Sequence, residues 1–408
     1  EHPEYETVQE DRTLNSMVPI WQKKKSEVTD EEYNSFYKEK FYDFEDPVAV
    51  IHADVEGAVT YKALLYVPAK APYDFYTKDF KKGLQLYSSG VMIMENCADL
   101  LPDCFRFVRG VVDSQDLSLN ISREMLQHDR QLKFIAGNLE KKIKTELQKL
   151  MDNDREKYEK FFAAFGPQIK YGVLADYGAK KETLQDLLLY WSSKQGKLIS
   201  LKEYVAAMPE DQKYIYYANG ESREALLQLP QMEKLQQKGC DVLFMTDEVD
   251  GFVPQTLAKY QEKELKAITA GDLGLETEEE KKAAEEKSEK SKQTLEFVKK
   301  TLGEQVKDVR LSDNLGSHPV SVVPDGGMTF EMEKYFKRMN PEAGMKADRI
   351  LELNADHPIF AKLQIAVAQD EKKAEDLVNI LYTQALLMAG LPVENAGEYT
   401  DLVCSLIG

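Results

Sequence analysis

The C-terminal end of this chain carries more apolar side chains than one face of a helix can hold. Between Glu371 and Ala389 they are Leu377, Val378, Ile380, Leu381, Ala385, Leu386, Leu387 and Met388. After Gly390-Leu391-Pro392, a second run follows the i, i+3, i+4, i+7, i+8 spacing of a helix, with Tyr399, Leu402, Val403, Leu406 and Ile407. A helix that is apolar on more than one side has to be covered on more than one side.

Two arrangements satisfy that constraint. Two consecutive apolar helices at a chain end favour a helical hairpin that packs against a second copy as a four-helix bundle. This interpretation predicts a homodimer whose interface contains Leu377, Leu381, Leu387, Tyr399, Leu402, Val403 and Leu406. The alternative is a hairpin that closes the core of its own chain.

The negative net charge of the chain argues against two kinds of partner, nucleic acid and membrane surfaces. The chain has 408 residues, 43% of them hydrophobic, and a net charge of -18, so roughly two to four domains are expected. Such an acidic chain repels phosphate backbones and anionic lipid, so we expect neither a nucleic-acid partner nor a membrane-surface role. No stretch has the roughly 20 apolar residues of a membrane span, and the first residues do not follow the signal-peptide pattern.

The reactive residue types are scattered. The four cysteines form no C-x-x-C pair and the five histidines have no metal-binding spacing, so reduced thiols, no metal site and a cytoplasmic location are expected. A catalytic cysteine stays an unfavoured alternative. There is neither a P-loop nor a G-x-G-x-x-G pattern, so the chain alone is not expected to hold a nucleotide cofactor.

The chain reads as a multidomain protein of the α/β and α+β classes. A polar linker, 1–12, precedes a large α/β unit, 13–150. We expect in it a helix from Asp30 to Tyr42, a hairpin of Val48–Val55 and Val59–Val67, strands in Leu84–Met94 and Cys104–Val112, and a long helix from the N-cap Ser122 past Leu150. A helical connector, 151–180, follows.

A small α/β unit, 181–258, completes a middle domain of residues 13–258. Ser200 and Glu203 fit a capping box, and the strand Lys213–Ala218, helix Ser222–Lys238 and strand Val242–Thr246 predict a right-handed parallel crossover. Residues 259–292 are expected to be a charged linker or solvated helix, because Glu276–Lys292 is almost all Glu, Lys, Ala and Ser. The remainder, 293–408, is expected to be a mixed α+β dimerisation domain with short strands near Val309–Leu311 and Val320–Val323.

Two further segments suggest binding. Met328, Met332, Tyr335, Phe336 and Met339 share one helical face after Gly326-Gly327. A Met/aromatic face can adapt to varied partners, although such a stripe more often belongs to a core. Arg123 and Gln127 lie one turn apart near the start of a predicted helix, where a guanidinium suits a phosphate; the ordinary alternative for Arg123 is a surface ion pair.

The segment around Arg123 also carries a resemblance. Arg109-Gly-Val-Val-Asp-Ser-Gln-Asp-Leu117 running into Leu119-Asn-Ile-Ser-Arg-Glu-Met-Leu-Gln127 closely resembles the catalytic-loop signature of the ninety-kilodalton heat-shock chaperones. The likeness continues in order at Pro19-Ile-Trp21, Val67-Pro68 with Ala71-Pro-Tyr-Asp-Phe75, Tyr216-Tyr-Ala-Asn-Gly-Glu-Ser222, Val242–Thr246 and Leu351-Glu-Leu-Asn-Ala-Asp-His-Pro358. It covers the chain from about Thr13 onward, and it implies the middle and C-terminal domains of a bacterial member without the nucleotide-binding domain.

The resemblance implies a function. The segment would dimerise through its C-terminus and bind unfolded or partly folded client proteins. Arg123, supported by Gln127, would contact ATP, bound with Mg in the preceding nucleotide-binding domain of the same chain. The implied client contacts are Phe252, Gln255, Met328, Met332, Tyr335 and Phe336, with Trp21 and Phe75 as weaker matches.

The departures from the family pattern limit this function. The nucleotide-pocket motifs are absent, so this segment alone is not expected to hydrolyse ATP. The sequence ends in Ser-Leu-Ile-Gly408 rather than an acidic tail, so docking of tetratricopeptide co-chaperones is not expected. The alternative is a non-catalytic scaffolding dimer that binds no client.

Overall fold

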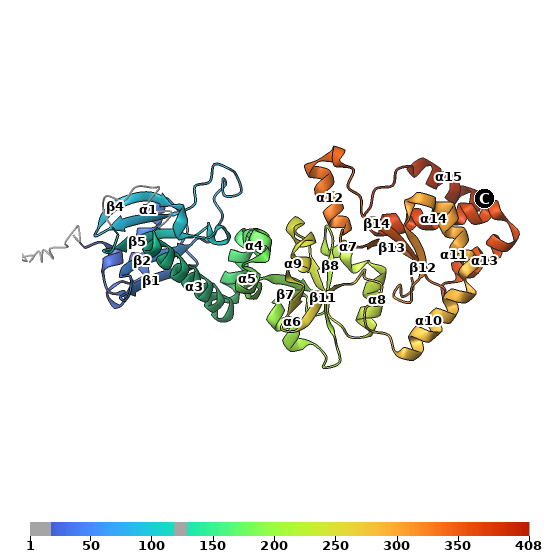
Figure 1. Ribbon diagram of the computed structural model, residues 1–408, viewed down its shortest axis with the longest axis horizontal. Coiled ribbons are helices and arrows are strands. Elements are labelled where there is room, and N and C mark those ends of the chain that lie inside the picture. Colours follow the sequence, from blue (N-terminus) through green and yellow to red (C-terminus); the bar gives the residue numbers. More distant parts are fainter. Residues whose placement is uncertain (1–17, 118–128, 408) are drawn as a thin grey trace, which may run out of the picture. The chain divides into compact units, whose positions relative to one another are not determined.

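The structure is a computed structural model that describes residues 18–117 and 129–407 (Figure 1). The chain divides into two compact units, unit 1 from Glu1 to Ile169 and unit 2 from Lys170 to Gly408. Ser122, Arg123 and Gln127 lie outside the described residues.

Unit 1 is a five-stranded sheet with helices. Its elements are α1 (Asp30–Phe41), β1 (Ala49–Val55), β2 (Tyr61–Val67), β3 (Leu84–Ser88), β4 (Val91–Cys97), β5 (Arg109–Ser114), α3 (Arg130–Asn153) and the first part of α4 (Arg155–Gly178). The strand order is β1-β2-β5-β3-β4, with β3 and β5 parallel and the other pairs antiparallel. The predicted hairpin is confirmed, and so is the predicted helix after Asp30.

The long helix of unit 1 does not run on from Ser122. Asp129 has an extended backbone (ψ 124°), and its carboxylate accepts hydrogen bonds from the backbone N–H groups of Gln131 and Leu132, at 2.7 and 3.0 Å. Asp129 is therefore the N-cap of this helix, α3 (Arg130–Asn153). Cys104–Val112 is also not one strand, because Asp103–Phe105 forms a 3₁₀ turn and β5 begins only at Arg109.

The first part of unit 2 is a small α/β domain. Its elements are α5 (Lys181–Leu184), β6 (Leu189–Ser192), β7 (Lys197–Ser200), α6 (Leu201–Ala207), β8 (Tyr214–Asn219), α7 (Arg223–Leu227), α8 (Pro230–Gln237), β9 (Leu243–Met245), α9 (Val253–Leu257), β10 (Lys259–Tyr260) and β11 (Lys263–Ala267). The strand order is β10-β11-β8-β9-β6-β7. The predicted capping box of Ser200 and Glu203 and the parallel pairing of β8 with β9 are both confirmed.

Two expectations for this domain need correction. The single helix from Ser222 to Lys238 is wrong: α7 ends at Leu227, and α8 restarts with Pro230 at its first position, where the missing N–H costs nothing. Residues 259–267, assigned from sequence to the charged linker, instead form β10 and β11, and β11 pairs with β8. The charged stretch itself is helical.

The second part of unit 2 is the C-terminal domain. Its elements are α10 (Glu278–Lys290), α11 (Lys292–Leu302), β12 (Asp308–Leu311), β13 (Val320–Asp325), α12 (Phe330–Met339), β14 (Asp348–Leu353), α13 (Pro358–Gln369), α14 (Glu371–Met388) and α15 (Ala396–Ile407). The strand order is β12-β14-β13, so the central strand is one that the sequence pattern did not predict. The mixed sheets and helices of the whole chain confirm the expected fold class.

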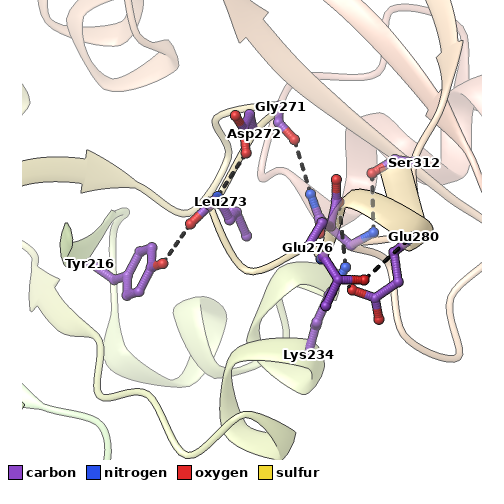
Figure 2. A network of polar contacts seen from close by, with 11 residues as sticks. Tyr216, Lys234, Gly271, Asp272, Leu273, Glu276, Glu280 and Ser312 are labelled. Atoms are coloured by element: carbon purple, nitrogen blue, oxygen red, sulfur yellow. Dashed lines mark hydrogen bonds and ion pairs between the residues drawn. The ribbon is translucent and has the colours of Figure 1, made fainter. Parts of the chain in front are cut away.

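The segment between β11 and α10, residues 268–277, joins the two parts of unit 2 and is called the polar connector below (Figure 2). The hydroxyl of Tyr216 on β8 donates to the carbonyl of Leu273 at 2.5 Å, and Leu273 itself is buried. The side-chain carboxylate of Asp272 accepts a hydrogen bond from the backbone N–H of Gly274 at 2.7 Å. From the C-terminal domain, the side-chain amide of Asn314 donates to the carbonyl of Gly271 at 3.0 Å. The connector is thus held by hydrogen bonds to both parts.

No helix in residues 18–117 and 129–407 is both long and apolar enough to cross a membrane. The same residues contain no group of three or more His, Cys, Asp or Glu side chains that could hold a metal ion. Cys97, Cys104 and Cys240 are buried, Cys404 is exposed, and none of the four forms a disulfide.

Gly110 provides a test of the sheet in unit 1. Its φ of +152° is rarely adopted by other residues, and a Cβ there would overlap the carbonyl oxygen of Leu64 and lie 2.8 Å from the Cα of Leu65. We expect Gly110→Ala to destabilise unit 1 by roughly 3 kcal/mol, because backbone strain and overpacking add. The matched control is Gly137→Ala, exposed on α3 with open space around it, which should stabilise by about 0.5–1 kcal/mol. Thermal unfolding measures both, and equal melting temperatures for the two variants would contradict the register of β2 and β5.

Candidate functional site

The Met/aromatic segment forms helix α12, between two glycine-containing links. The hydroxyl of Thr329 accepts from the backbone N–H of Met332 at 3.2 Å and caps the helix. Before the cap, Gly326 has a left-handed φ of +84°, and both Gly326 and Gly327 have open space around them. The sequence expectation that Met328 to Met339 is helical on one face therefore holds from Phe330 onward.

One side of α12 is fixed to its own domain. Glu333 accepts a hydrogen bond from the guanidinium of Arg349 at 2.9 Å and another from the backbone N–H of Ala347 at 2.9 Å. Both side chains are largely buried, and Arg349 is the second residue of the central strand β14. Phe330 packs into the core of the C-terminal domain. A buried pair of this kind fixes orientation, because either charge alone would be costly to bury.

The opposite side of α12 contacts the small α/β domain. The ring of Phe252 meets the rings of Tyr335 and Phe336 edge to face, with centroids 5.3 and 5.8 Å apart. The side-chain amide of Gln255 donates to the carbonyl of Gly327 at 2.7 Å and lies 3.9 Å from the sulfur of Met332. Five of the expected client contacts are thus brought together, with Phe252 and Gln255 on one wall and Met332, Tyr335 and Phe336 of α12 on the other.

Ion pairs lie around this aromatic cluster. Lys334 contacts Glu221 and Glu331, each at 3.0 Å, and Arg338 contacts Glu248 at 2.5 Å. A groove of about 590 Å³ lies beside them, lined by residues of α12, by the ends of β8 and β9 and by Leu391 and Pro392. Its walls therefore combine cationic, acidic and apolar groups.

A buried lysine holds the loop that presents Phe252. The ammonium of Lys170 on α4 donates to Asp250 at 2.7 Å and to Asp247 at 2.8 Å, and it lies 4.6 Å from the ring centroid of Tyr190. Burial raises the pKa of the Asp250 carboxyl, and the charge of Lys170 opposes that shift. The 3₁₀ turn Glu248–Gly251 is therefore tied down directly before Phe252.

The exposure of the expected client contacts differs from residue to residue. Phe252, Met328, Tyr335 and Phe336 are half-buried and Gln255 is exposed, whereas Met332 is buried with 5% of its surface exposed. The core interpretation of the Met/aromatic face holds for Met332. Met332 packs inside, and the rings line an accessible edge.

Trp21 and Phe75 belong to the core of unit 1. Trp21 donates from its indole N–H to Asp113 at 3.1 Å and packs on Tyr87, and 7% of its surface is exposed. Phe75 is fully buried between Phe80 and Phe165. A client chain cannot reach such covered rings in this state. Trp21 and Phe75 are therefore core residues in this structure rather than accessible contacts. The sequence could not show this, because an aromatic residue in a loop sequence does not reveal whether its ring points inward.

The C-terminal residues are divided between core and surface. Leu377 and Leu381 on α14 are buried in the core of their own domain, so the sequence interpretation that placed them at a dimer interface is not supported by their position. Leu387 and Leu406 are exposed by 54% and 41%, and Tyr399, Leu402 and Val403 on α15 are half-buried.

Several residues on or near α12 were not among the expected site residues. Met339, at the end of α12, is 70% exposed and was not among the expected client contacts, although its spacing places it on the same face. Lys170, Asp250, Glu333 and Arg349 are ordinary charged residues in the sequence. Only the fold brings their partners together.

The fold and this site define a class of multidomain α/β proteins in which a Met/aromatic helix meets an aromatic loop of the preceding domain. A family model described as "Hsp90 protein" matches residues 2–408. The chaperone protein HtpG of Bacillus subtilis is 53% identical over 404 residues, and those of Oceanobacillus iheyensis and Clostridium acetobutylicum are 51% and 52% identical. Each comparison covers 99% of this chain and 64% of the relative. The chain belongs to the Hsp90 family, and the resemblance predicted from its motifs is confirmed.

Proposed function

We propose that this segment is the client-binding and dimerising part of a molecular chaperone. The observation that supports this proposal is the cluster of Phe252, Tyr335, Phe336 and Met339, which offers accessible apolar surface beside charged groups. The relatives that cover 99% of the chain are named as chaperones. The chaperone activity of the whole protein is part of this proposal, because the chain spans only 64% of the length of those relatives.

The chemistry of the cluster suits varied partners. Methionine is flexible and polarizable, and half-buried rings present both faces and edges, so segments of different shape can pack on them. The neighbouring cations and carboxylates can pair with polar groups that flank an apolar client segment. Binding at each site should be weak, because the exposed apolar area is small.

Client binding is tested by replacing the exposed part of the cluster. We expect Phe336→Ser combined with Met339→Ser to weaken suppression of aggregation of a heat-denatured test protein about tenfold, since central aromatic anchors carry most of such binding. The matched control is Ile365→Ser, which removes an apolar side chain of similar exposure (56%) on α13. Light scattering against chaperone concentration gives the measurement.

The buried position of Met332 favours a second candidate, a scaffolding dimer in which the α12 face serves only internal packing. Under that alternative, the double variant would lose thermal stability while suppression per folded molecule stayed equal to that of the control. Unchanged melting with lost suppression supports client binding.

Dimerisation through the C-terminus is the second component of the proposal. The residues that are exposed or half-buried on α15 lie along one face of the helix, namely Tyr399, Leu402, Val403 and Leu406, with Leu387 of α14 exposed nearby in sequence. An apolar strip at this edge fits the same strip of a second copy related by a twofold axis. The interface would therefore be formed by α15 and the end of α14 rather than by Leu377 and Leu381.

Charge placed on that face should separate the copies. We expect Val403→Glu combined with Leu406→Glu to weaken self-association at least about a hundredfold, because the carboxylates would be buried without partners. Cys404→Glu is the control, since it adds the same charge on the opposite side of α15, where Cys404 is exposed. Analytical ultracentrifugation reports the mass. A dimer that survives the double change, or a wild-type chain that is monomeric at micromolar concentration, contradicts this interface.

The third component concerns Arg123 and Gln127, for which the motif resemblance is the support. An arginine reaching ATP in another domain would stabilise charge that develops during phosphoryl transfer, and Gln127 would hold it in position. In a full-length protein that carries the nucleotide domain, we expect Arg123→Ala to lower ATP turnover about a thousandfold while self-association persists. Arg130→Ala, exposed at the start of α3, is the control, and equal turnover in the two variants would remove the assignment.

A further inference from the structure

The apolar face of α12 is covered by residues of the small α/β domain. Met332 is only 5% exposed, and its cover consists of Gln255, 3.9 Å from its sulfur, and the 3₁₀ turn before Phe252. A Cβ placed on Gly251 of that turn would lie 3.5 Å from the Cβ of Glu331 and 3.6 Å from the backbone nitrogen of Met332. The turn therefore lies directly against the first turn of α12.

The two sides of α12 are held with unequal strength. On the side of its own domain, the Glu333 and Arg349 side chains are 11% and 6% exposed, so the ion pair between them is shielded from water and salt. On the covering side, Arg338 and Glu248 are 61% and 53% exposed, and Glu221, which contacts Lys334, is 72% exposed. Exposed pairs contribute little and are screened by salt. Any separation would leave α12 on the C-terminal domain.

Other contacts between the small α/β domain and the C-terminal domain are also polar, and one of them, from the side-chain amide of Gln231 to the hydroxyl of Ser321 at 3.2 Å, is buried. Glu233 on α8 accepts from the backbone N–H and the hydroxyl of Ser317 at 2.7 and 2.9 Å. Lys234 contacts Glu276, in the segment before α10, at 3.6 Å (Figure 2). Asn314 bonds to Gly271 of the connector but its side-chain oxygen, though buried, has no hydrogen-bond partner in the described part of the chain. The exposed contacts among these can be exchanged for water at small cost, unlike a dry apolar core.

From these contacts we propose that α12 alternates between a covered state, as in this structure, and an open state in which the Met332 face is accessible. The ion pairs Arg338–Glu248 and Lys334–Glu221 hold the cover in place. This inference rests on the proposed function, since it concerns regulation of the client site. A client segment that binds Met332 and the rings would compete with Phe252 and Gln255 for the same face.

A thiol at the covered position measures the opening directly. In the full 408-residue chain with Cys404→Ser, Met332→Cys places a thiol under the cover, and its rate of reaction with a maleimide, followed by mass spectrometry, reports accessibility. We expect Glu248→Arg or Arg338→Glu to raise that rate about three- to tenfold, because an attraction becomes a repulsion. The double reversal, Glu248→Arg with Arg338→Glu, should return the rate to near the starting value. Lys337→Glu is the control, an equal change of charge at an exposed position of the same helix.

The maleimide labelling rates of these variants test whether α12 has a covered state. Rates that rise in both single reversals and fall again in the double reversal support the covered state, and added sodium chloride should raise the starting rate in the same direction. Equal rates in all variants, or a double reversal as fast as the singles, would overturn it. Unfolding is distinguished by the buried thiols Cys97, Cys104 and Cys240, which must stay unlabelled if the cover alone opens.

The same variants separate this inference from the proposed function. Suppression of aggregation by Glu248→Arg in the otherwise wild-type chain should improve by a factor similar to the labelling rate. If labelling rises and suppression does not, the client proposal fails while the cover stands. If labelling does not respond, the cover fails whatever the suppression assay shows.

Discussion

The buried pair of Glu333 and Arg349 decides where the Met/aromatic helix lies. The carboxylate accepts from the guanidinium and also from the backbone N–H of Ala347, both at 2.9 Å. Charges in such a position are stabilising only together, so the helix cannot rotate about its axis without breaking the pair. The rotation fixed in this way directs Phe330 into the C-terminal core and Tyr335 and Phe336 toward the neighbouring domain. Every property proposed for α12 follows from that orientation.

A second buried pair performs the same task on the facing wall. Lys170 and Asp250 fix the turn before Phe252, as Glu333 and Arg349 fix the helix across from it. Each wall is therefore rigid with respect to its own domain. The contacts between the walls are aromatic edges, one amide hydrogen bond and exposed ion pairs. A strong bond within each domain and weak bonds between them favour relative motion of the two walls over local unfolding of either.

The sequence predicted the elements whose signals are local. The capping box of Ser200 and Glu203, the hairpin of β1 and β2 and the parallel crossover of β8 and β9 depend on neighbouring residues or on one short connection, and each is present. The break between α7 and α8 was missed because the apolar spacing continues across Pro230. Strand β14 was missed because its pairing with β12 and β13 is non-local. The helical face of Met332, Tyr335 and Phe336 was predicted from its spacing, but the burial of Met332 could not be, since it depends on Gln255, which is distant in sequence.

The apolar surplus at the C-terminus shows why spacing alone could not assign the interface. Helix α14 buries Leu377 and Leu381 against its own domain, and the apolar excess appears at Leu387 and along α15. Under the proposed dimerisation a second copy covers this strip, and in a chain with net charge -18 that contact has to be specific and well packed to outweigh the repulsion between copies. The same repulsion discourages random association through Met339 and the rings near it. An acidic surface of this kind reduces aggregation through exposed apolar groups, as the proposed client-binding surface would require.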